Sequence, residues 1–191
     1  MSQEASPHNL LNKGTFLIAS PEITSGFFFR SVILLCEHSS AGSFGLIVNK
    51  PLNIEMPEEI NQLGPQNNPN IFLKAGGPLQ PNQMMLLHND PNLTDQTLEL
   101  TPSLFLGGDV EFLNKAMITE SGPSVFLCFG YTGWTAGFLE KEYLDGMWFL
   151  TKGNSDQLFN TPPEKLWQTI LREMGGKYAT LSMIPEDLSL N

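Results

Sequence analysis

Apolar residues occur in short runs separated by turn-forming residues along most of this chain. Three such runs come early, at 15–20, 31–37 and 44–49, and each is rich in β-branched and other apolar side chains. Runs of this length and composition predict strands. A parallel pair would need a crossover of a dozen or more residues, and the second and third runs are much closer together than that. We therefore expect these two runs to form an antiparallel hairpin that turns at residues 39–43.

The later pattern predicts further strands and four helices in an irregular order. We expect strands at 71–75, 84–88, 104–106, 125–129 and 147–150, helices at 57–63, 110–120 and 138–143, and a final helix capped at residue 161. The early clustering of strands argues against a regular alternation of strands and helices. The predicted class is α+β, with a bent sheet that is mixed or mainly antiparallel and is flanked by about four helices. We expect one domain over residues 1–191, with loose termini at 1–12 and 185–191.

Two of the predicted helices carry recognisable start signals. Asp109 can cap the helix over 110–120. Thr161 and Glu164 have the spacing of a capping box, and Pro162 stands in the first helical position. The glycines at 175–176 are expected to end the final helix.

Charge and composition narrow the classes of function. The chain has 191 residues, of which 41% are hydrophobic, and a formal net charge of -10. A surface with this balance repels phosphate backbones unless its few basic residues cluster. No stretch of the sequence has the Lys and Arg density of a basic patch, so we expect no direct contact with nucleic acid.

The two cysteines indicate a reducing compartment. Cys36 and Cys128 each lie inside an apolar run, without a Cys-x-x-Cys partner or metal-ligand spacing nearby. Both are interpreted as small buried hydrophobes, with a disulfide as the alternative, and no metal or other cofactor is expected. The polar start of the chain lacks the pattern of a signal peptide, and no apolar run approaches the ~18 residues that a membrane span needs. The predicted location is cytoplasmic, with no membrane contact.

The segment 130–137 is the most informative stretch of the chain. It follows the strand-like run at 125–129 and leads into an acidic, helix-like run, with three glycines and two aromatic rings in between. A glycine-rich turn in such a place lets the backbone approach a ligand or another backbone closely. The candidate contact residues here are Tyr131, Gly133, Trp134, Gly137 and Glu140.

Two interpretations of this segment remain open. Its glycine spacing fits neither a P-loop nor the G-x-G-x-x-G pattern, and Glu140 and Glu142 would repel a phosphate at the start of the helix. In the favoured interpretation the segment is a structural turn, and Trp134 buries much of its ring to pin that turn to the core. In the other, the same residues contact a ligand or a partner.

Two histidines are further candidates because each ends an apolar strand. Side chains two residues apart share a strand face, which would place Cys36 beside His38 and His88 beside Asp90. Together such groups could form a metal site or an acid–base pair. The favoured interpretation is that each histidine is a hydrogen-bonded structural residue.

Basic residues and tight turns suggest one more candidate site. Arg30 and Lys50 flank strands in a chain that has little positive charge, and Asn49 precedes Lys50 at the end of the third strand. Gly76 and Gly77 follow the fourth strand. These residues could border one pocket at a common sheet edge, but ordinary turns that pair with local carboxylates are favoured.

Several longer stretches together resemble one family. They are 14–21 (GTFLIASP), 29–38 (FRSVILLCEH), 45–51 (GLIVNKP), 76–78 (GGP) with 87–88 (LH), and 130–142 (GYTGWTAGFLEKE) with Trp148. Over nearly its whole length the chain resembles the YqgE/AlgH family of bacterial proteins, which implies a compact single-domain α+β protein of the bacterial cytosol. The family usually has Gly-Gln-Leu-Glu where this chain has Gly-Phe-Leu-Glu at 137–140. Phe138 cannot replace that glutamine in a polar role.

The sequence does not specify a reaction. The resembling family has no established enzymatic activity, and some of its members are labelled transcriptional regulators. The chain itself has no Gly-x-Ser-x-Gly and no His-Glu-x-x-His pattern. We expect a non-enzymatic cytosolic protein that binds an unknown protein partner, in a setting that could be regulatory. The first alternative is a small-molecule-binding protein or enzyme with a pocket near the 130–137 segment, and the second is a transcriptional regulator that contacts DNA directly.

Overall fold

The computed structural model describes residues 10–52, 70–92, 96–118 and 122–185, together with residues 58, 62 and 68. The strands in this part of the chain are β1 (Thr15–Ala19), β2 (Val32–Ser39), β3 (Gly42–Ile47), β4 (Ile71–Ala75), β5 (Leu79–His88), β6 (Thr97–Thr101), β7 (Leu104–Gly107), β8 (Val125–Thr135) and β9 (Trp148–Lys152). The helices are α3 (Val110–Ile118), α4 (Phe138–Leu144), α5 (Ser155–Asn160), α6 (Pro163–Met174) and α7 (Gly176–Leu181). The helix expected at 57–63 falls almost entirely outside the described residues.

All the described strands belong to one sheet. The order across it is β6-β7-β5-β8-β3-β2-β1-β9, and β4 pairs with β8 off this path. Every neighbouring pair is antiparallel except β4 and β8, which are parallel. The predicted α+β class with a mixed, mainly antiparallel sheet is therefore confirmed. The predicted hairpin of β2 and β3 is also confirmed, although its turn is tighter than expected because Ser39 already pairs with Gly42.

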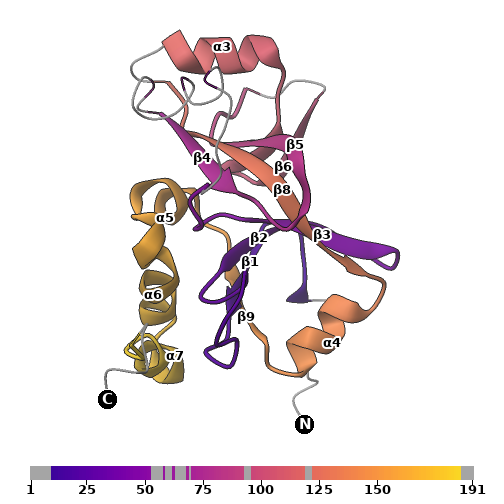
Figure 1. The fold of residues 1–191 in the computed structure, drawn as a ribbon, viewed down its shortest axis with the longest axis vertical. Helices are drawn as coiled ribbons and strands as arrows, with labels where there is room; N and C mark the ends of the chain where they lie inside the picture. The colour runs from indigo at the N-terminus through magenta and orange to yellow at the C-terminus, as the bar shows by residue number, and fades with distance from the viewer. Residues whose placement is uncertain are drawn as a thin grey trace.

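Strand β8 joins the two halves of the sheet. Residues 125–131 of β8 pair with β4 and β5, and residues 132–135 pair with β3. In Figure 1 the strand runs diagonally from the upper group of strands to the lower group that contains β1, β2 and β9. The prediction of a turn over 130–137 is therefore wrong for most of that segment, because the strand continues through it and only residues 136–137 turn.

Glycines allow β8 to continue because the connection between β4 and β5 lies directly against it. A Cβ atom on Gly130 would stand 2.3 Å from the carbonyl oxygen of Gly77, and one on Gly77 would stand 2.0 Å from the carbonyl carbon of Tyr131. The backbone of Gly76 makes one 2.8 Å hydrogen bond to β8 and another to β3. These glycines thus permit the connection between β4 and β5 to pack closely against β8.

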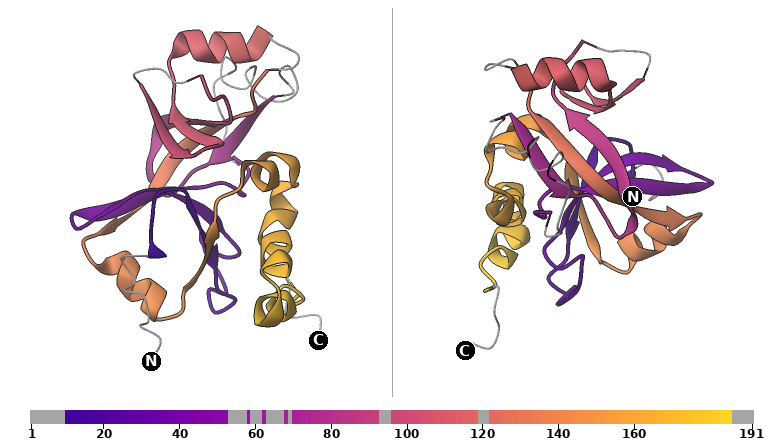
Figure 2. Two further views of the ribbon diagram at one scale, coloured as in Figure 1. Left: turned by 180° about the vertical axis from the view of Figure 1, so that it is seen from behind. Right: turned by 45° about the horizontal axis from the view of Figure 1, so that its top comes forward.

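The long apolar runs of the first strands follow from burial on both faces of the sheet. Phe16 and Ile18 of β1 belong to the core cluster beneath α6, whereas Leu17 and Ala19 belong to the cluster beneath α4. A third cluster lies between α3 and the upper strands. Figures 1 and 2 show the same three layers, with α5, α6 and α7 on one side of β9, α4 on the other and α3 across the far end. Two-sided burial removes the polar alternation that a half-exposed strand would show.

The start of the last long helix differs from the prediction. Helix α6 has Pro162 at its N-cap and no side-chain capping bond, so the capping box expected from Thr161 and Glu164 is wrong. The reason is that the chain before it is already helical, and Thr161 serves as the extended C-cap of α5. Helix α5 itself is capped by Asn154, whose side-chain oxygen accepts hydrogen bonds from two backbone N–H groups.

Three further local features of the sequence, Asp109, Gly175 and the run at 97–101, can be compared with the structure. Asp109 caps α3 as expected, since its Oδ1 accepts a hydrogen bond from the N–H of Phe112 at 2.8 Å. Gly175 ends α6 as expected, but the chain forms a further short helix, α7, immediately afterwards. Strand β6 was not expected, although its sequence TLELT alternates with the period of a strand.

The predicted loose arm is shorter than expected at its inner end. Leu11 is only 1% exposed and belongs to the core cluster beneath α4. Residues 1–9 and 186–191 lie outside the described part of the chain. Among the described helices, none has both the length and the apolar composition that crossing a membrane would require.

Candidate functional site

A cavity of about 400 Å³ lies where the end of β8, α4 and the start of β9 meet. We name it the aromatic cavity and define it by Ile23, Phe28, Trp134, Phe138, Glu142 and Trp148. It sits over the core cluster beneath α4, against which the side chains of Ile23, Phe28 and Trp134 pack. Gly133 also lines it, so two of the candidate residues from the 130–137 segment contribute to this cavity.

Helix α4 faces the end of β8 because the chain turns between them within two residues. Gly137 has a φ of 78°, a left-handed conformation that glycine adopts at little cost. No heavy atom lies within 4 Å of where its Cβ would be, so its role is conformational rather than steric. The buried side chain of Leu139 fixes α4 to the core. The neighbouring Phe138 is then 58% exposed at the rim of the aromatic cavity.

Glu142 organises the rings of the aromatic cavity. Its Oε2 accepts hydrogen bonds from the indole Nε1 atoms of both Trp134 and Trp148, each at 2.8 Å. The two indoles are almost perpendicular, at 88° with centroids 6.2 Å apart, and Phe28 stands edge-on to Trp148 at 6.0 Å. Among the described residues nothing donates a hydrogen bond to Oε1 of Glu142. One carboxylate oxygen thus holds two rings, and the other remains available to a ligand.

Trp134 combines both roles that its sequence context suggested. Its ring is half-buried, packs on the core cluster beneath α4 and makes a hydrogen bond, as a pinning residue would. The same ring lines the aromatic cavity. Tyr131 lies elsewhere, since it contacts Phe44 edge-on at 6.2 Å and lines a separate cavity of about 340 Å³.

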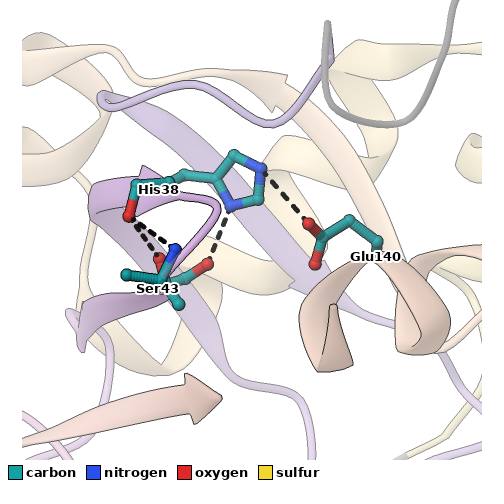
Figure 3. Close-up of polar contacts among 6 residues, drawn as sticks. His38, Ser43 and Glu140 are labelled. Atoms are coloured by element: carbon teal, nitrogen blue, oxygen red, sulfur yellow. Dashed lines mark hydrogen bonds and ion pairs between the residues drawn. The ribbon is translucent and has the colours of Figure 1, made fainter. Parts of the chain in front are cut away.

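Two predicted residues, His38 and Glu140, meet beside the aromatic cavity. Figure 3 shows His38 of β2 between Ser43 of β3 and Glu140 of α4. The Nδ1 atom of His38 is 2.7 Å from the Ser43 hydroxyl, and its Nε2 is 3.7 Å from Oε1 of Glu140. The side chains of His38 and Glu140 are only 4% and 13% exposed. Sequence reasoning missed Ser43, whose cross-strand pairing with His38 follows only from the length of the hairpin turn.

This arrangement ties the hairpin of β2 and β3 to α4. A hydroxyl, an imidazole and a carboxylate in series can move a proton. None of the three residues lines the aromatic cavity, so the cavity offers no place for a substrate next to the hydroxyl. The geometry therefore supports a structural link that positions α4, and with it Phe138 and Glu142.

The predicted pairing of His38 with Cys36 on one strand face is wrong. A β-bulge between Leu35 and Glu37 shifts the register, so the alternation of faces is interrupted at Cys36. Cys36 points into the cluster beneath α6, and burial raises its thiol pKa. Burial also raises the pKa of the Cys128 thiol, to about 12. Both cysteines are buried free thiols without the lowered pKa of a reactive cysteine.

His88 lies in the other half of the sheet, beneath α3. Its ring is 1% exposed between Phe105 and Phe112, with centroid separations of 5.7 and 4.3 Å. Its Nδ1 accepts a hydrogen bond from the backbone N–H of Asp90 at 3.2 Å, rather than meeting that carboxylate. Burial lowers the His88 pKa, against the opposing influence of the Asp90 carboxylate and the Gly107 backbone. Among the described residues, the ring Nε2 has no partner that meets the geometry of a hydrogen bond. No group of three or more metal-ligating side chains occurs among the described residues.

Asn49 and Lys50 hold the loop that precedes β2. The Asn49 side chain accepts a hydrogen bond from Val32 N–H at 2.8 Å and donates one to the Arg30 carbonyl at 2.9 Å. Lys50 donates to the Phe29 carbonyl at 2.7 Å. Arg30 has a φ of 50° and stacks its guanidinium 4.7 Å from the Trp167 ring.

The segments at 49–50 and 76–77 do lie side by side. The N–H of Ala75 donates a hydrogen bond to the carbonyl of Lys50 at 3.2 Å, next to the glycine pair. The contact between the two segments is thus between backbone groups. These contacts of Asn49, Lys50, Gly76 and Gly77 are structural ones between neighbouring segments, while the expected pairing with local carboxylates stays a prediction.

Lys74 is a buried cation that the sequence signals did not single out. Its side chain is 3% exposed, and its Nζ lies 4.6 Å from the centre of the Phe126 ring. Burial lowers its pKa to about 8, against the opposing influence of Cys128 and Glu164. It belongs to the core beneath α6 and not to the aromatic cavity.

Comparisons with known proteins identify a family and relatives that this chain resembles. Residues 16–179 match the DUF179 family model, which is described as AlgH-like. A UPF0301 protein of Chlamydia pneumoniae is 54% identical over 185 residues, with 97% of this chain and 98% of that protein covered. A UPF0301 protein of Chlorobaculum tepidum is 36% identical, with 95% and 97% covered.

Two solved structures share the fold. The crystal structure of protein DIP2367 from Corynebacterium diphtheriae has a TM-score of 0.73 at 22% identity, covering 96% of this chain and 95% of that one. The solution structure of the AlgH protein from Pseudomonas aeruginosa has a TM-score of 0.69 at 27% identity, with 97% of each chain covered. Since the family model spans most of the sequence and close relatives match it from end to end, the chain belongs to the AlgH-like family.

Proposed function

We propose that this protein is a non-enzymatic binding protein of the cytosol that recognises a partner protein, with a cationic side chain of the partner seated in the aromatic cavity. The observation that carries the proposal is the arrangement around Glu142, where one carboxylate oxygen holds two perpendicular indoles. The other oxygen has no hydrogen bond from a described residue.

The chemistry of the aromatic cavity favours a cation. Ammonium and guanidinium groups are attracted to the faces of Trp and Phe rings, by about 0.5–2 kcal/mol depending on how far they are desolvated. A carboxylate at the same place adds a charge-assisted hydrogen bond. The described residues that line the cavity include no Lys or Arg, so within the described part of the chain no such cation occupies it. A net charge of -10 also draws cationic partners toward the surface.

The surroundings of the aromatic cavity favour a protein over a small cation. Phe138 and Leu144 are 58% and 69% exposed on the short helix α4, although both are large apolar residues. Exposed aromatic residues beside a cavity are typical of protein-binding surfaces, where a buried anchor is surrounded by apolar contacts. The phenylalanine at 138 extends this apolar surface, where a glutamine would interrupt it.

Direct DNA binding is not supported by this surface. A regulator that contacts DNA needs lysines and arginines that release counterions from phosphates. The chain has ten such residues against twenty acidic ones. A regulatory role therefore fits only through the partner protein.

A peptide titration tests the proposed function. Short peptides with a central Lys or Arg flanked by apolar residues are titrated into the protein while tryptophan fluorescence is followed. We expect saturable binding that Glu142→Gln weakens by about tenfold, since a charge-assisted hydrogen bond contributes about 1.5–3 kcal/mol. Asp145→Asn is the matched control, because it removes an exposed carboxylate at the C-cap of the same helix that does not line the cavity. Binding that is indifferent to Glu142→Gln, or equal loss in both variants, would contradict the proposal.

A further inference from the structure

We propose that a second cavity, along β9 and the start of β1, binds a small anionic molecule that carries a phosphate or carboxylate on a ring-shaped body. The cavity has a volume of about 640 Å³, which is within the usual range of small-molecule sites. We name it the lysine cavity and define it by Lys13, Tyr143, Trp148, Thr151, Lys152 and Tyr178. Its ligand would be independent of the partner protein proposed above.

The lysine cavity is built by the register of β1 and β9. Lys152, the last residue of β9, pairs with Thr15, the first residue of β1, and Lys13 lies two residues earlier in the turn before β1, so the two lysines come to the same cavity. The backbone between them is fixed by a 2.8 Å hydrogen bond from Gly153 N–H to the Gly14 carbonyl. The turn that carries Lys13 is thus held against the end of β9 by backbone hydrogen bonding.

Gly14 closes one wall of the lysine cavity. It has a φ of 82°, and a Cβ on it would stand 2.4 Å from the carbonyl oxygen of Leu100. The chain at 12–15 can therefore lie directly against the end of β6, which brings residues 100–102 to the lining. A side chain at position 14 would force these two walls apart.

The charge of the lysine cavity is opposite to that of the protein as a whole. The chain has a net charge of -10, but the described residues that line this cavity include two lysines and no Asp or Glu. Within the described part of the chain neither Lys13 nor Lys152 has a carboxylate within ion-pair distance. A third lysine, Lys177, lies over the ring of Tyr178 at 5.2 Å. Such a local excess of positive charge attracts an anion.

The remaining lining suits a ring with polar substituents. Tyr143, Trp148 and Tyr178 provide aromatic surface, and the Tyr178 ring is held edge-on against Phe149 at 5.0 Å. The hydroxyls of the tyrosines and of Thr151 can donate or accept hydrogen bonds. A nucleic-acid chain would need several more phosphate contacts than two lysines can give. The combination therefore favours a single small molecule, such as a nucleotide or an aromatic carboxylate.

NMR titration of the full-length protein tests this inference. Four probes are compared by amide chemical shifts: adenosine monophosphate, benzoate, adenosine and inorganic phosphate. We expect adenosine monophosphate or benzoate to saturate with a dissociation constant below ~1 mM, shifting the amides of residues 13–15 and 151–152. The double variant Lys13→Gln, Lys152→Gln should weaken that binding at least about tenfold. Lys165→Gln, an exposed lysine on α6 outside the cavity, should change it by less than about twofold.

The outcomes separate the parts of the inference. Binding of adenosine as tight as that of adenosine monophosphate would overturn the anionic part, and inorganic phosphate binding equally well would overturn the ring part. If neither anionic ring probe gives lysine-dependent saturation, the whole inference is wrong. Because both lysines are exposed, the variants are expected to fold, and unchanged amide shifts elsewhere in the spectrum check this. The peptide titration at the aromatic cavity is read separately, so failure of one site leaves the other testable.

Discussion

The aromatic cavity and the lysine cavity share one lining residue, Trp148, but differ in charge and in construction. The aromatic cavity takes its carboxylate from α4, a short helix that follows a glycine with open space around it. The lysine cavity takes its cations from the end of β9 and from the turn before β1, two strands whose register is fixed by sheet pairing. The difference teaches that a net charge of -10 describes the whole surface and not the individual sites. Four changes test the contrast, from the largest expected effect to the smallest.

Truncating Trp148, which lines both cavities, should have the largest effect on stability. Trp148 is 4% exposed, and truncating a buried Trp to Ala typically costs about 3–5 kcal/mol. We expect that loss in the free energy of unfolding for Trp148→Ala. Trp134→Ala should lose about half as much, because its ring is only half-buried. Urea denaturation of both variants measures this. Equal losses, or a loss below about 1 kcal/mol for Trp148→Ala, would contradict this difference in burial.

The two glycines that shape the cavities should differ in cost. Gly14→Ala places a Cβ 2.4 Å from a backbone oxygen at a φ of 82°, so strain and a steric clash add up. We expect a loss of about 3 kcal/mol or more in the free energy of unfolding. Gly137→Ala has a similar φ, of 78°, but no atom within 4 Å, so only the left-handed penalty of about 1–2 kcal/mol applies. Thermal unfolding that ranks the two in the opposite order would contradict the steric argument.

Glutamine and alanine at position 142 should separate charge from ring placement. Glu142→Gln keeps a carbonyl oxygen for both indoles, so we expect its stability to change by less than about 1 kcal/mol while cationic peptides bind about tenfold more weakly. Glu142→Ala removes the acceptor of two indole N–H groups and should cost about 1–3 kcal/mol as well. Denaturation and peptide titration are measured on the same samples. A stability loss in Glu142→Gln as large as in Glu142→Ala would argue against the acceptor role.

The dependence of stability on pH should come in part from His88, which lines neither cavity. Burial lowers the pKa of His88, so the unfolded chain binds a proton more readily than the folded protein below about pH 6.5. Stability from this group is therefore present above that pH and is lost as the pH falls. The loss is at most about 1.4 kcal/mol per pH unit. Urea denaturation at pH 7.5 and 5.5 should show a smaller pH dependence for His88→Gln than for the unmodified protein. An equal dependence in both would exclude His88 as its source.

Much of the fold could be predicted from the chain, and the reason is visible in β1 and β2. Their apolar runs are buried on both faces, so periodicity and composition give a clear signal. The capping residue Asp109 also acts locally and was readable. Thr161 was misread because its role depends on α5, a helix too short to have a periodic pattern. The continuation of β8 through its glycines depends on the backbone of Gly77, which lies far away in the sequence.

The candidate site was predictable only in part, for the same reason. The aromatic residue Trp134 stood out because a large ring in a glycine-rich segment is unusual. Its partner Trp148 and the bridging Glu142 could not be assigned, because their contact depends on how α4 folds back between β8 and β9. The contact of Ser43 follows from a hairpin register that a bulge alters, and the lysine pair follows from the pairing of β1 with β9, two strands far apart in the sequence.

An NMR titration with two probes of opposite charge tests the central claim that the two cavities select ligands of opposite charge. The indole N–H and backbone amide signals of the full-length protein are recorded with tetramethylammonium and, separately, with adenosine monophosphate. The account predicts that tetramethylammonium shifts the Trp134 indole signal and leaves the amides of Thr151 and Lys152 unchanged, while adenosine monophosphate does the reverse. Trp148, which lines both cavities, should respond to both probes, through its indole or its backbone amide signal. If both probes shift the same set of signals, or if neither shifts any signal at the two cavities, the account is contradicted.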